Sequence, residues 1–307
     1  MNILKYFIKI TGHFLFVIIF IFFSTLQAKN LDKFNNADNI ADYFSGILLL
    51  NSSKYNDSFN HFKRLDGLED SHRSFSSNYL YSLINSGNYN LAFKYSKKLD
   101  RENKDNFESN LILGIYYLKN SKFDLSSNYF LKAKKRNPGL ILNNYLGDTL
   151  YIWSNLHNIR FDQATNNLNK LDDRFENLKK IQNVFLNCFF NNKETQNLYE
   201  ELISDKKIDF SRYSYFYAKY LNSIGEKKVA KKIIIDTLKT YPRNLLLNQY
   251  KIDLERPKKT FDFNCREKTH VVAEIIYITA NALSSQTFYK LSNFYLNLSK
   301  YLNQDFL

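Results

Sequence analysis

Apolar residues recur along this chain at intervals of three and four positions, which is the spacing of amphipathic helices. The clearest example is the stretch from Phe107 to Pro138. A polar pair, Asn120-Ser121, interrupts its apolar pattern near the middle. The proline ends the pattern, because a helix rarely continues through the residue before a proline. The stretch therefore predicts two helices joined by a short turn.

The same two-helix pattern returns along the chain, and three consecutive units start near Asn39, Arg73 and Phe107. Gly114 stands two periods after Gly46, and Phe130 stands two periods after Phe62. A single helical hairpin cannot bury both of its apolar faces, so such units need neighbours of the same kind. We expect an all-α chain of stacked hairpins.

The pattern continues less regularly after residue 138. Further helix pairs are predicted over residues 146–171, 175–203 and 211–242. Residues 251–270 are charged, contain Pro257 and lack a clear period, so we interpret them as an irregular loop or an imperfect half-unit. A last helix pair is predicted over residues 271–307. Residues 29–250 would then form the main body of the array.

The first 28 residues have a different character. Lys5 and Lys9 give a positive start, an unbroken apolar run follows from Phe14 to Phe23, and small residues come next. This is the layout of a secretory signal peptide, and the run is short for a membrane-spanning helix. Leu26 stands where a cleavage site prefers a small residue, so an uncleaved inner-membrane anchor over residues 10–26 is the alternative. Both interpretations predict a periplasmic chain, either released or anchored.

A helix–turn–helix period of about 34 residues resembles the tetratricopeptide repeat. This family places a small residue in the first helix of each unit, where Gly46, Gly114, Gly147 and Ala218 stand, and another in the second helix, where Ala92, Ser126, Ala164 and Ala230 stand. Pro138 and Pro242 match the proline that ends a unit, whereas the family's opening tryptophan is absent from the units. The order of units also resembles secreted repeat proteins of alphaproteobacteria. The resemblance implies a right-handed α-solenoid of about six or seven hairpins.

In tetratricopeptide proteins the first helices of successive units line a groove that receives a peptide or a partner helix. The resemblance therefore implies a ligand groove along the first helices of this chain. The matching positions are Tyr43, Tyr81, Asn85, Lys119, Arg212, Tyr215 and Lys219. Tyrosine, arginine and asparagine suit such a surface because they combine apolar area with polar groups. The three cations among these positions favour an acidic ligand.

The formal net charge of +13 indicates a second possibility. A positive protein attracts nucleic acid and anionic envelope polymers, so a basic adaptor for such a polymer is the alternative to a protein-binding scaffold. The lysines are spread along the chain, however, and the joint abundance of Asn, Lys, Ile, Phe and Tyr is typical of AT-rich codons. The secretory segment argues against nucleic acid as the partner.

The sequence offers little catalytic or metal-binding chemistry. No two of its eight glycines lie within seven residues of each other, which excludes the glycine motifs of dinucleotide-binding and P-loop proteins. The five histidines lack the paired helical spacing of a metal site. Asp172-Asp173 is expected to be a solvated helix end. We therefore expect a non-enzymatic protein with no cofactor, no metal and no small-molecule substrate.

Two cysteines, Cys188 and Cys265, could form a disulfide in an oxidising compartment. They fall in different predicted units, and pairing would require their Cα atoms to lie within about 7 Å of each other. Because Cys188 lies in the apolar run Val184–Phe190, we expect a buried thiol there instead.

Overall fold

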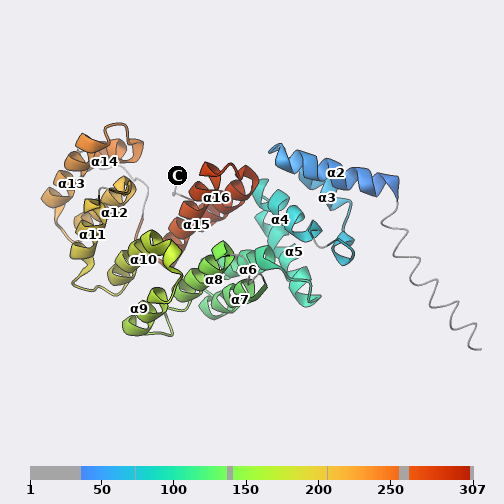
Figure 1. Ribbon diagram of the computed structural model, residues 1–307, viewed down its shortest axis with the longest axis horizontal. Helices are drawn as coiled ribbons and strands as arrows, with labels where there is room; N and C mark the ends of the chain where they lie inside the picture. The colour runs from blue at the N-terminus through green and yellow to red at the C-terminus, as the bar shows by residue number, and fades with distance from the viewer. Residues whose placement is uncertain (1–35, 73, 137–140, 206, 256–262, 305–307) are drawn as a thin grey trace, which may run out of the picture. The chain divides into compact units, whose positions relative to one another are not determined.

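The computed structural model describes residues 36–72, 74–136, 141–205, 207–255 and 263–304 (Figure 1). These residues form fifteen α-helices, two short 3-10 helices and no β-strand. Consecutive helices pack against each other in pairs. The prediction of an all-α solenoid of helical hairpins is confirmed.

Four features named from the sequence lie outside the described residues: the signal-like segment 1–28, Arg73, Pro138 and Pro257. In the part of the chain that the structure covers, no helix combines the length and the apolar character that crossing a bilayer requires.

The chain divides into two compact units, unit 1 (Met1–Ser86) and unit 2 (Gly87–Leu307). Unit 1 contains α2 (Ala37–Asn51), α3 (Tyr55–Lys63), the 3-10 helix η1 (Leu68–Asp70) and α4 (Phe75–Asn85). Unit 2 begins with α5 (Tyr89–Arg101), α6 (Phe107–Lys119), α7 (Phe123–Arg136), α8 (Ile141–Ser154), α9 (Phe161–Asn169) and the 3-10 helix η2 (Asp173–Phe175). Its later helices are α10 (Glu176–Phe189), α11 (Thr195–Ser204), α12 (Ser211–Ser223), α13 (Lys227–Thr240), α14 (Leu245–Glu255), α15 (Lys268–Ser285) and α16 (Tyr289–Leu302).

The turns between paired helices repeat the period of the sequence. Ser53, Gly87 and Ser121 follow one another at intervals of one period, and all three have a left-handed backbone, with φ values of 59°, 77° and 56°. Asn191 and Gly225 adopt the same conformation after α10 and α12. A left-handed residue at this place ends the first helix and reverses the chain direction. These turns therefore keep one geometry although the residue type varies, whereas the turn between α8 and α9 has no left-handed residue.

The crossing of the two helices within a hairpin is also repeated. A Cβ atom added to Gly46 would lie 2.5 Å from the ring of Phe62, and one added to Gly114 would meet Phe130 in the same way. Glycine is needed at these positions because the aromatic ring packs directly on the backbone. The hydroxyl of Ser126 donates a 2.8 Å hydrogen bond to the carbonyl of Gly114.

Three hairpins share this hydroxyl-to-carbonyl bond at a spacing of twelve residues. The pairs are Ser58 with Gly46, Ser126 with Gly114, and Ser292 with Ala280, each at 2.8 Å. The bond ties the second helix of a hairpin to the first at their closest approach. Its presence between α15 and α16 indicates that the C-terminal pair is built like the regular hairpins.

Other small residues named for packing are also found at helix contacts. Ala92, Ala164, Ala218 and Ala230 are fully buried. A Cβ atom on Gly147 would lie 2.8 Å from the Cβ atom of Lys134, so this glycine serves the contact of α8 with α7. Pro242 lies in the turn after α13, and its carbonyl accepts a 2.9 Å hydrogen bond from the side-chain amide of Asn248.

The structure describes the two ends of the predicted irregular stretch 251–270, and residues 256–262 between them lie outside the described residues. Helix α14 runs through Lys251 to Glu255, and α15 begins at Lys268. Only Leu247, Tyr250 and Asp253 of α14 are buried, so the apolar period of this helix is faint in the sequence.

The two C-terminal helices, α15 and α16, pack against helices from the beginning of unit 2. Within this unit, α15 packs against α6 and α8, and α16 packs against α6 (Figure 1). Helix α15 is buried along most of its length, from Val271 to Leu283. This pair is therefore a structural part of unit 2.

Candidate functional site

The three groove candidates of unit 1 lie on its first helices, α2 and α4. Tyr43 is half-buried in α2, with its hydroxyl 3.4 Å from Nδ1 of His72 and the two rings 4.6 Å apart. Burial raises the pKa of Tyr43 above its usual value. Tyr81 of α4 is half-buried against the core cluster formed by Leu50 and its neighbours. Asn85, also half-buried, ends the same helix.

In unit 2 the candidate Lys119 contacts the C-terminal helix of the same unit. Its ammonium group lies 4.0 Å from the ring centroid of Tyr301 and donates a hydrogen bond to the Tyr301 carbonyl. Burial lowers the pKa of Lys119 below its usual value. The hydroxyl of Tyr89 adds a 3.3 Å bond to the carbonyl of Asn297. These contacts fasten α16 to α5 and α6.

The candidate Arg212 of α12 forms a two-pronged ion pair with Glu274 of α15. Its Nε and Nη2 atoms lie 2.9 and 2.8 Å from the two carboxylate oxygens, and Glu274 is fully buried. The hydroxyl of Tyr213 donates a further 3.2 Å bond to this carboxylate. Burial alone would lower the pKa of Arg212, but the adjacent Glu274 carboxylate raises it above its usual value. The guanidinium therefore stays charged and neutralises the buried acid.

The guanidinium of Arg212 also lies over an aromatic ring of α15, 4.2 Å from the centroid of Tyr277. This cation–π contact adds to the ion pair, because a guanidinium is weakly hydrated and attracted to the ring face. Lys119 on α6 and Arg212 on α12 thus both bind the C-terminal helix pair, which consists of α15 and α16.

The last two candidates lie close together on α12. Tyr215 is fully buried, with its ring 4.9 Å from that of Tyr250 in α14. The ammonium group of Lys219 lies 5.8 Å from the Tyr250 ring centroid. A cavity of about 250 Å³ adjoins Lys219 and is also lined by Asn264 and Arg266. Tyr215 supports α14 from inside the core.

The structure corrects the expectation of a free thiol at Cys188. Cys188 in α10 and Cys265 just before α15 form a disulfide, with their Cα atoms 5.9 Å apart. The sequence pattern could not show this, because the two residues belong to elements 77 residues apart that meet only when the C-terminal pair folds back. An oxidising compartment is where such a bond persists.

The start of α15 carries a buried cation that the sequence analysis did not single out. The ammonium group of Lys268 lies 4.0 Å from the ring centroid of Phe123. The carboxylate of Asp124, next along α7, accepts a 2.9 Å hydrogen bond from Nε2 of His157. Burial lowers the pKa of Lys268 to about 8, and the nearby Asp124 charge partly opposes that shift. Ion pair, disulfide and cation–π contact therefore all join α15 to its own unit.

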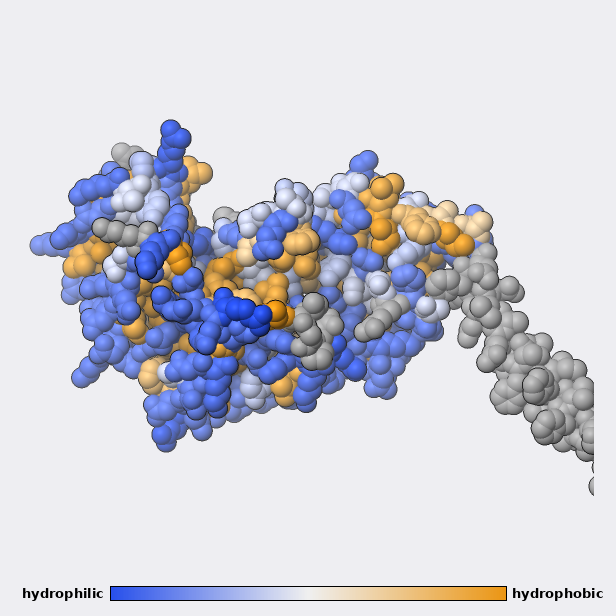
Figure 2. All heavy atoms as spheres, viewed as in Figure 1, coloured by the Kyte–Doolittle hydropathy of each residue, from blue (hydrophilic) through white to orange (hydrophobic). Residues whose placement is uncertain are grey.

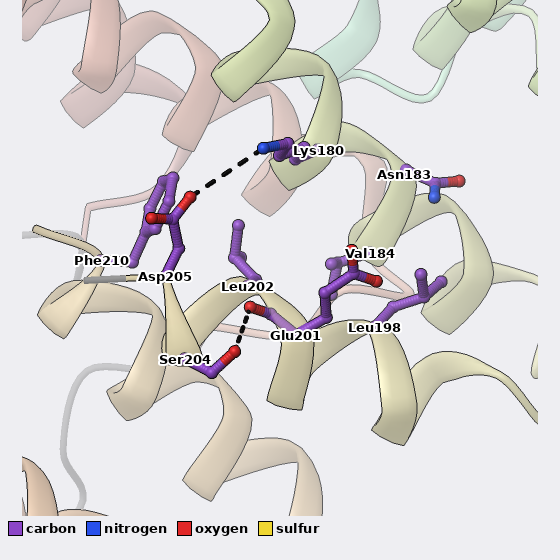
Figure 3. Close-up of a pocket in the computed structure, with 9 residues that line it drawn as sticks. All are labelled: Lys180, Asn183, Val184, Leu198, Glu201, Leu202, Ser204, Asp205 and Phe210. Atoms are coloured by element: carbon purple, nitrogen blue, oxygen red, sulfur yellow. Dashed lines mark hydrogen bonds and ion pairs between the residues drawn. The ribbon is translucent and has the colours of Figure 1, made fainter. Parts of the chain in front are cut away.

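A second cavity, of about 320 Å³, lies between α10 and α11 (Figure 3). Its apolar lining comes from Val184, Leu198, Leu202 and Phe210. Lys180 and Asp205 face each other at one side, with 3.9 Å between Nζ and Oδ2. The cavity thus combines apolar walls with one ion pair at its side.

Large apolar side chains are exposed on α2, at the N-terminal end of the described chain (Figure 2). They are Ile40, Phe44 and Leu48. Contiguous apolar surface of this kind commonly marks an interaction site. Neither a scan against protein-family models nor a search of curated proteins finds a match to this chain.

Proposed function

We propose that this protein is a non-enzymatic tetratricopeptide-like scaffold that binds a protein or peptide partner in the bacterial cell envelope. The turn geometry that returns once per period supports the family resemblance, as does the glycine–aromatic crossing shared by Gly46 and Gly114. A preformed helical surface needs little reordering on binding, so contact area converts to affinity with a small entropic loss.

One observation carries the proposal: in unit 2 the predicted groove positions already hold helices. Lys119 and Arg212 lie on different first helices, and both bind the C-terminal pair of their own unit. The first helix of a hairpin in this chain can thus bind another helix through the side chains at its groove positions. Unit 1 carries Tyr43 and Tyr81 at the matching places, and both are partly exposed.

The partner therefore binds along α2 and α4 of unit 1. The two tyrosines supply apolar area with a polar group at the tip, and Asn85 supplies hydrogen-bonding groups. A helix or extended peptide of a partner protein fits such a surface. We propose a periplasmic location, reached through the segment 1–28, with attachment to the inner membrane through residues 10–26 as the alternative.

The test is affinity capture from an envelope extract with the full chain, at low and at high salt. We expect a discrete protein that stays bound at high salt and is lost when Tyr81 is changed to Ala. The matched control is Tyr289→Ala, because Tyr289 is an exposed tyrosine of unit 2 and is not one of the groove positions. Circular dichroism of both variants verifies that they fold.

Capture of an anionic polymer alone, and only at low salt, would overturn the proposal. Steep salt dependence is the mark of charge-driven polymer binding. That result would favour the basic adaptor that the net charge of +13 also allows.

A further inference from the structure

A cavity of about 250 Å³ lies where α12 meets the segment 263–266, which leads into α15. Its walls come from the last two turns of α12 and from this segment, so residues distant in the sequence line it together. Two of the lining side chains are cations, Lys219 on α12 and Arg266 on the segment. None of the described residues that line the cavity is acidic. The lining therefore favours a negatively charged ligand.

Several polar groups of the lining are hydrogen-bond donors. Lysine and arginine side chains can only donate. The amide of Asn264 is oriented by the backbone N–H of Arg266, which donates a 2.9 Å hydrogen bond to its Oδ1 atom. The amino group of Asn264 is thus the end of this side chain that can donate to a ligand. Together with the two cations it forms a set of donors that matches the oxygen atoms of an oxyanion.

The segment that carries these donors is held in place on both sides of Asn264. Phe263 is buried, and its ring stacks on that of Phe216 in α12 with 4.1 Å between the centroids. Cys265 is joined to Cys188 of α10 by the disulfide. A wall that is fixed before a ligand arrives loses little entropy on binding.

The size and the opening of the cavity indicate what carries the negative group. Pockets that enclose a whole small molecule usually measure about 300 to 1,000 Å³, and this cavity is smaller. Asn264 and Arg266 are exposed, so the cavity opens to solvent and to an approaching protein. The buried rings of Phe216 and Phe263 add an apolar part to the lining. A glutamate side chain has a matching character, because two methylene groups precede its carboxylate.

We propose that this cavity binds the carboxylate of a glutamate side chain, which a partner protein inserts between α12 and the segment 263–266. Lys219, Asn264 and Arg266 donate to the carboxylate oxygens, and the methylene groups lie against the aromatic rings. Charge-assisted hydrogen bonds of this kind are stronger than neutral ones. The inference goes beyond the proposed function, because the cavity belongs to unit 2 and the surface proposed there lies on α2 and α4. It rests on the proposed function only in taking the ligand from a protein.

The cavity also accounts for the last of the three cations that the family resemblance placed in a groove. Lys119 and Arg212 bind the C-terminal pair of their own unit. Lys219 instead lines the cavity. Asn264 and Arg266 lie in none of the described helices, which is why the repeat pattern did not indicate them. Two cations in one cavity suit a single carboxylate, whereas an anionic polymer requires many cations along its length.

The test is an NMR titration of the full chain with two matched probes, the peptide acetyl-Gly-Glu-Gly-amide and its neutral counterpart acetyl-Gly-Gln-Gly-amide. We expect the glutamate peptide to shift the side-chain N–H signals of Arg266 and Asn264 in a saturable way. The glutamine peptide should leave these signals unchanged, because it lacks the charge. A dissociation constant in the millimolar range is expected, because each partly exposed charge pair contributes little.

The donors are tested one at a time. Arg266→Gln should raise the dissociation constant of the glutamate peptide about three- to tenfold, because it removes a charge-assisted donor. Lys219→Gln should have a similar effect. The matched control is Lys228→Gln, because this lysine of α13 is exposed and does not line the cavity. All three variants remove one positive charge, so an effect of net charge alone would appear in all three. Circular dichroism verifies that they fold.

The proposal would be overturned by the absence of saturable shifts, by equal binding of the glutamine peptide, or by equal weakening in Lys228→Gln. Free acetate carries the same group without the rest of the glutamate side chain, so it should bind more weakly. Acetate that binds at least as tightly would overturn the assignment to a partner's side chain. Tyr81→Ala should bind the glutamate peptide as the wild type does, so this site and the surface on α2 and α4 are tested separately.

Discussion

At the scale of single residues, the most consequential contact is the one between Arg212 and Glu274. The carboxylate is fully buried and depends on the guanidinium and on Tyr213 for its partners. Removing one member of a buried pair leaves the other charge uncompensated, which is far more costly than the pair itself is stabilising. This pair therefore decides whether α15 can stay against α12.

We predict that Arg212→Ala lowers the free energy of unfolding by about 3 to 5 kcal/mol, because it leaves Glu274 buried without a countercharge. Urea denaturation followed by circular dichroism measures the change. The control is Lys231→Ala, which breaks an exposed ion pair with Glu255 and should cost less than about 1 kcal/mol. A loss of the same size in both variants would contradict the role given to Arg212.

Lys268 leads to a prediction about pH. Its pKa falls from an unfolded value near 10.5 to about 8 in the folded chain, so between these values the unfolded chain binds more protons. Stability contributed by this group must then rise with pH from about 8 to 10.5, and the cost of burying the charge is fully present below pH 8. We expect Lys268→Met to be more stable than the wild type at pH 7.

The difference in unfolding free energy between Lys268→Met and the wild type should shrink as the pH rises through that window. Measuring the difference removes the contribution of the other titrating side chains, which both proteins share. A difference that stays constant from pH 7 to 10.5 would show that Lys268 does not lose its proton early.

At the scale of helices, the sequence predicted the regular hairpins because their information is local. The spacing of Gly46 from Phe62 is set within one hairpin, and the same spacing returns in Gly114 and Phe130. The return of the C-terminal pair onto α6 and α8 has no such signal. It depends on single contacts such as Arg212 with Glu274, 62 residues apart, which leave no period in the chain. The sequence therefore indicated residues such as Arg212 as groove positions, but it did not indicate the residues of the same chain that they contact.

The disulfide gives a prediction at this scale, because it joins α10 to the start of α15. A loop of this length is expected to contribute about 4 to 5 kcal/mol by restricting the unfolded chain. We expect a reductant to lower the urea midpoint of the wild type and to leave the double variant Cys188→Ser, Cys265→Ser unchanged. Two free thiols in the unreduced, unfolded protein would contradict the bond.

At the scale of the whole molecule, the two units differ in the size of their cores. The core cluster of unit 1 is formed by Leu50, Phe62, Leu65 and Phe75. Unit 2 buries many more apolar side chains, among them Trp153, Phe185 and most of α15. Opening a unit with a small core costs less free energy, because less apolar surface becomes exposed. Unit 1 should therefore open more readily than unit 2.

This difference is measurable by native-state hydrogen exchange, because amides of a unit that opens alone share one low opening free energy. We expect the central amides of α3 to exchange through such an opening, and those of α6 and α15 only at higher free energy. Phe62→Ala, which removes a fully buried ring of unit 1, should speed exchange in α2 to α4 and leave α15 unchanged. If α3 and α15 exchange together in both proteins, the chain opens as one body. A readily opened unit 1 would also be the part of the chain that a bound partner stabilises most, since binding to the folded form alone adds directly to its free energy of unfolding.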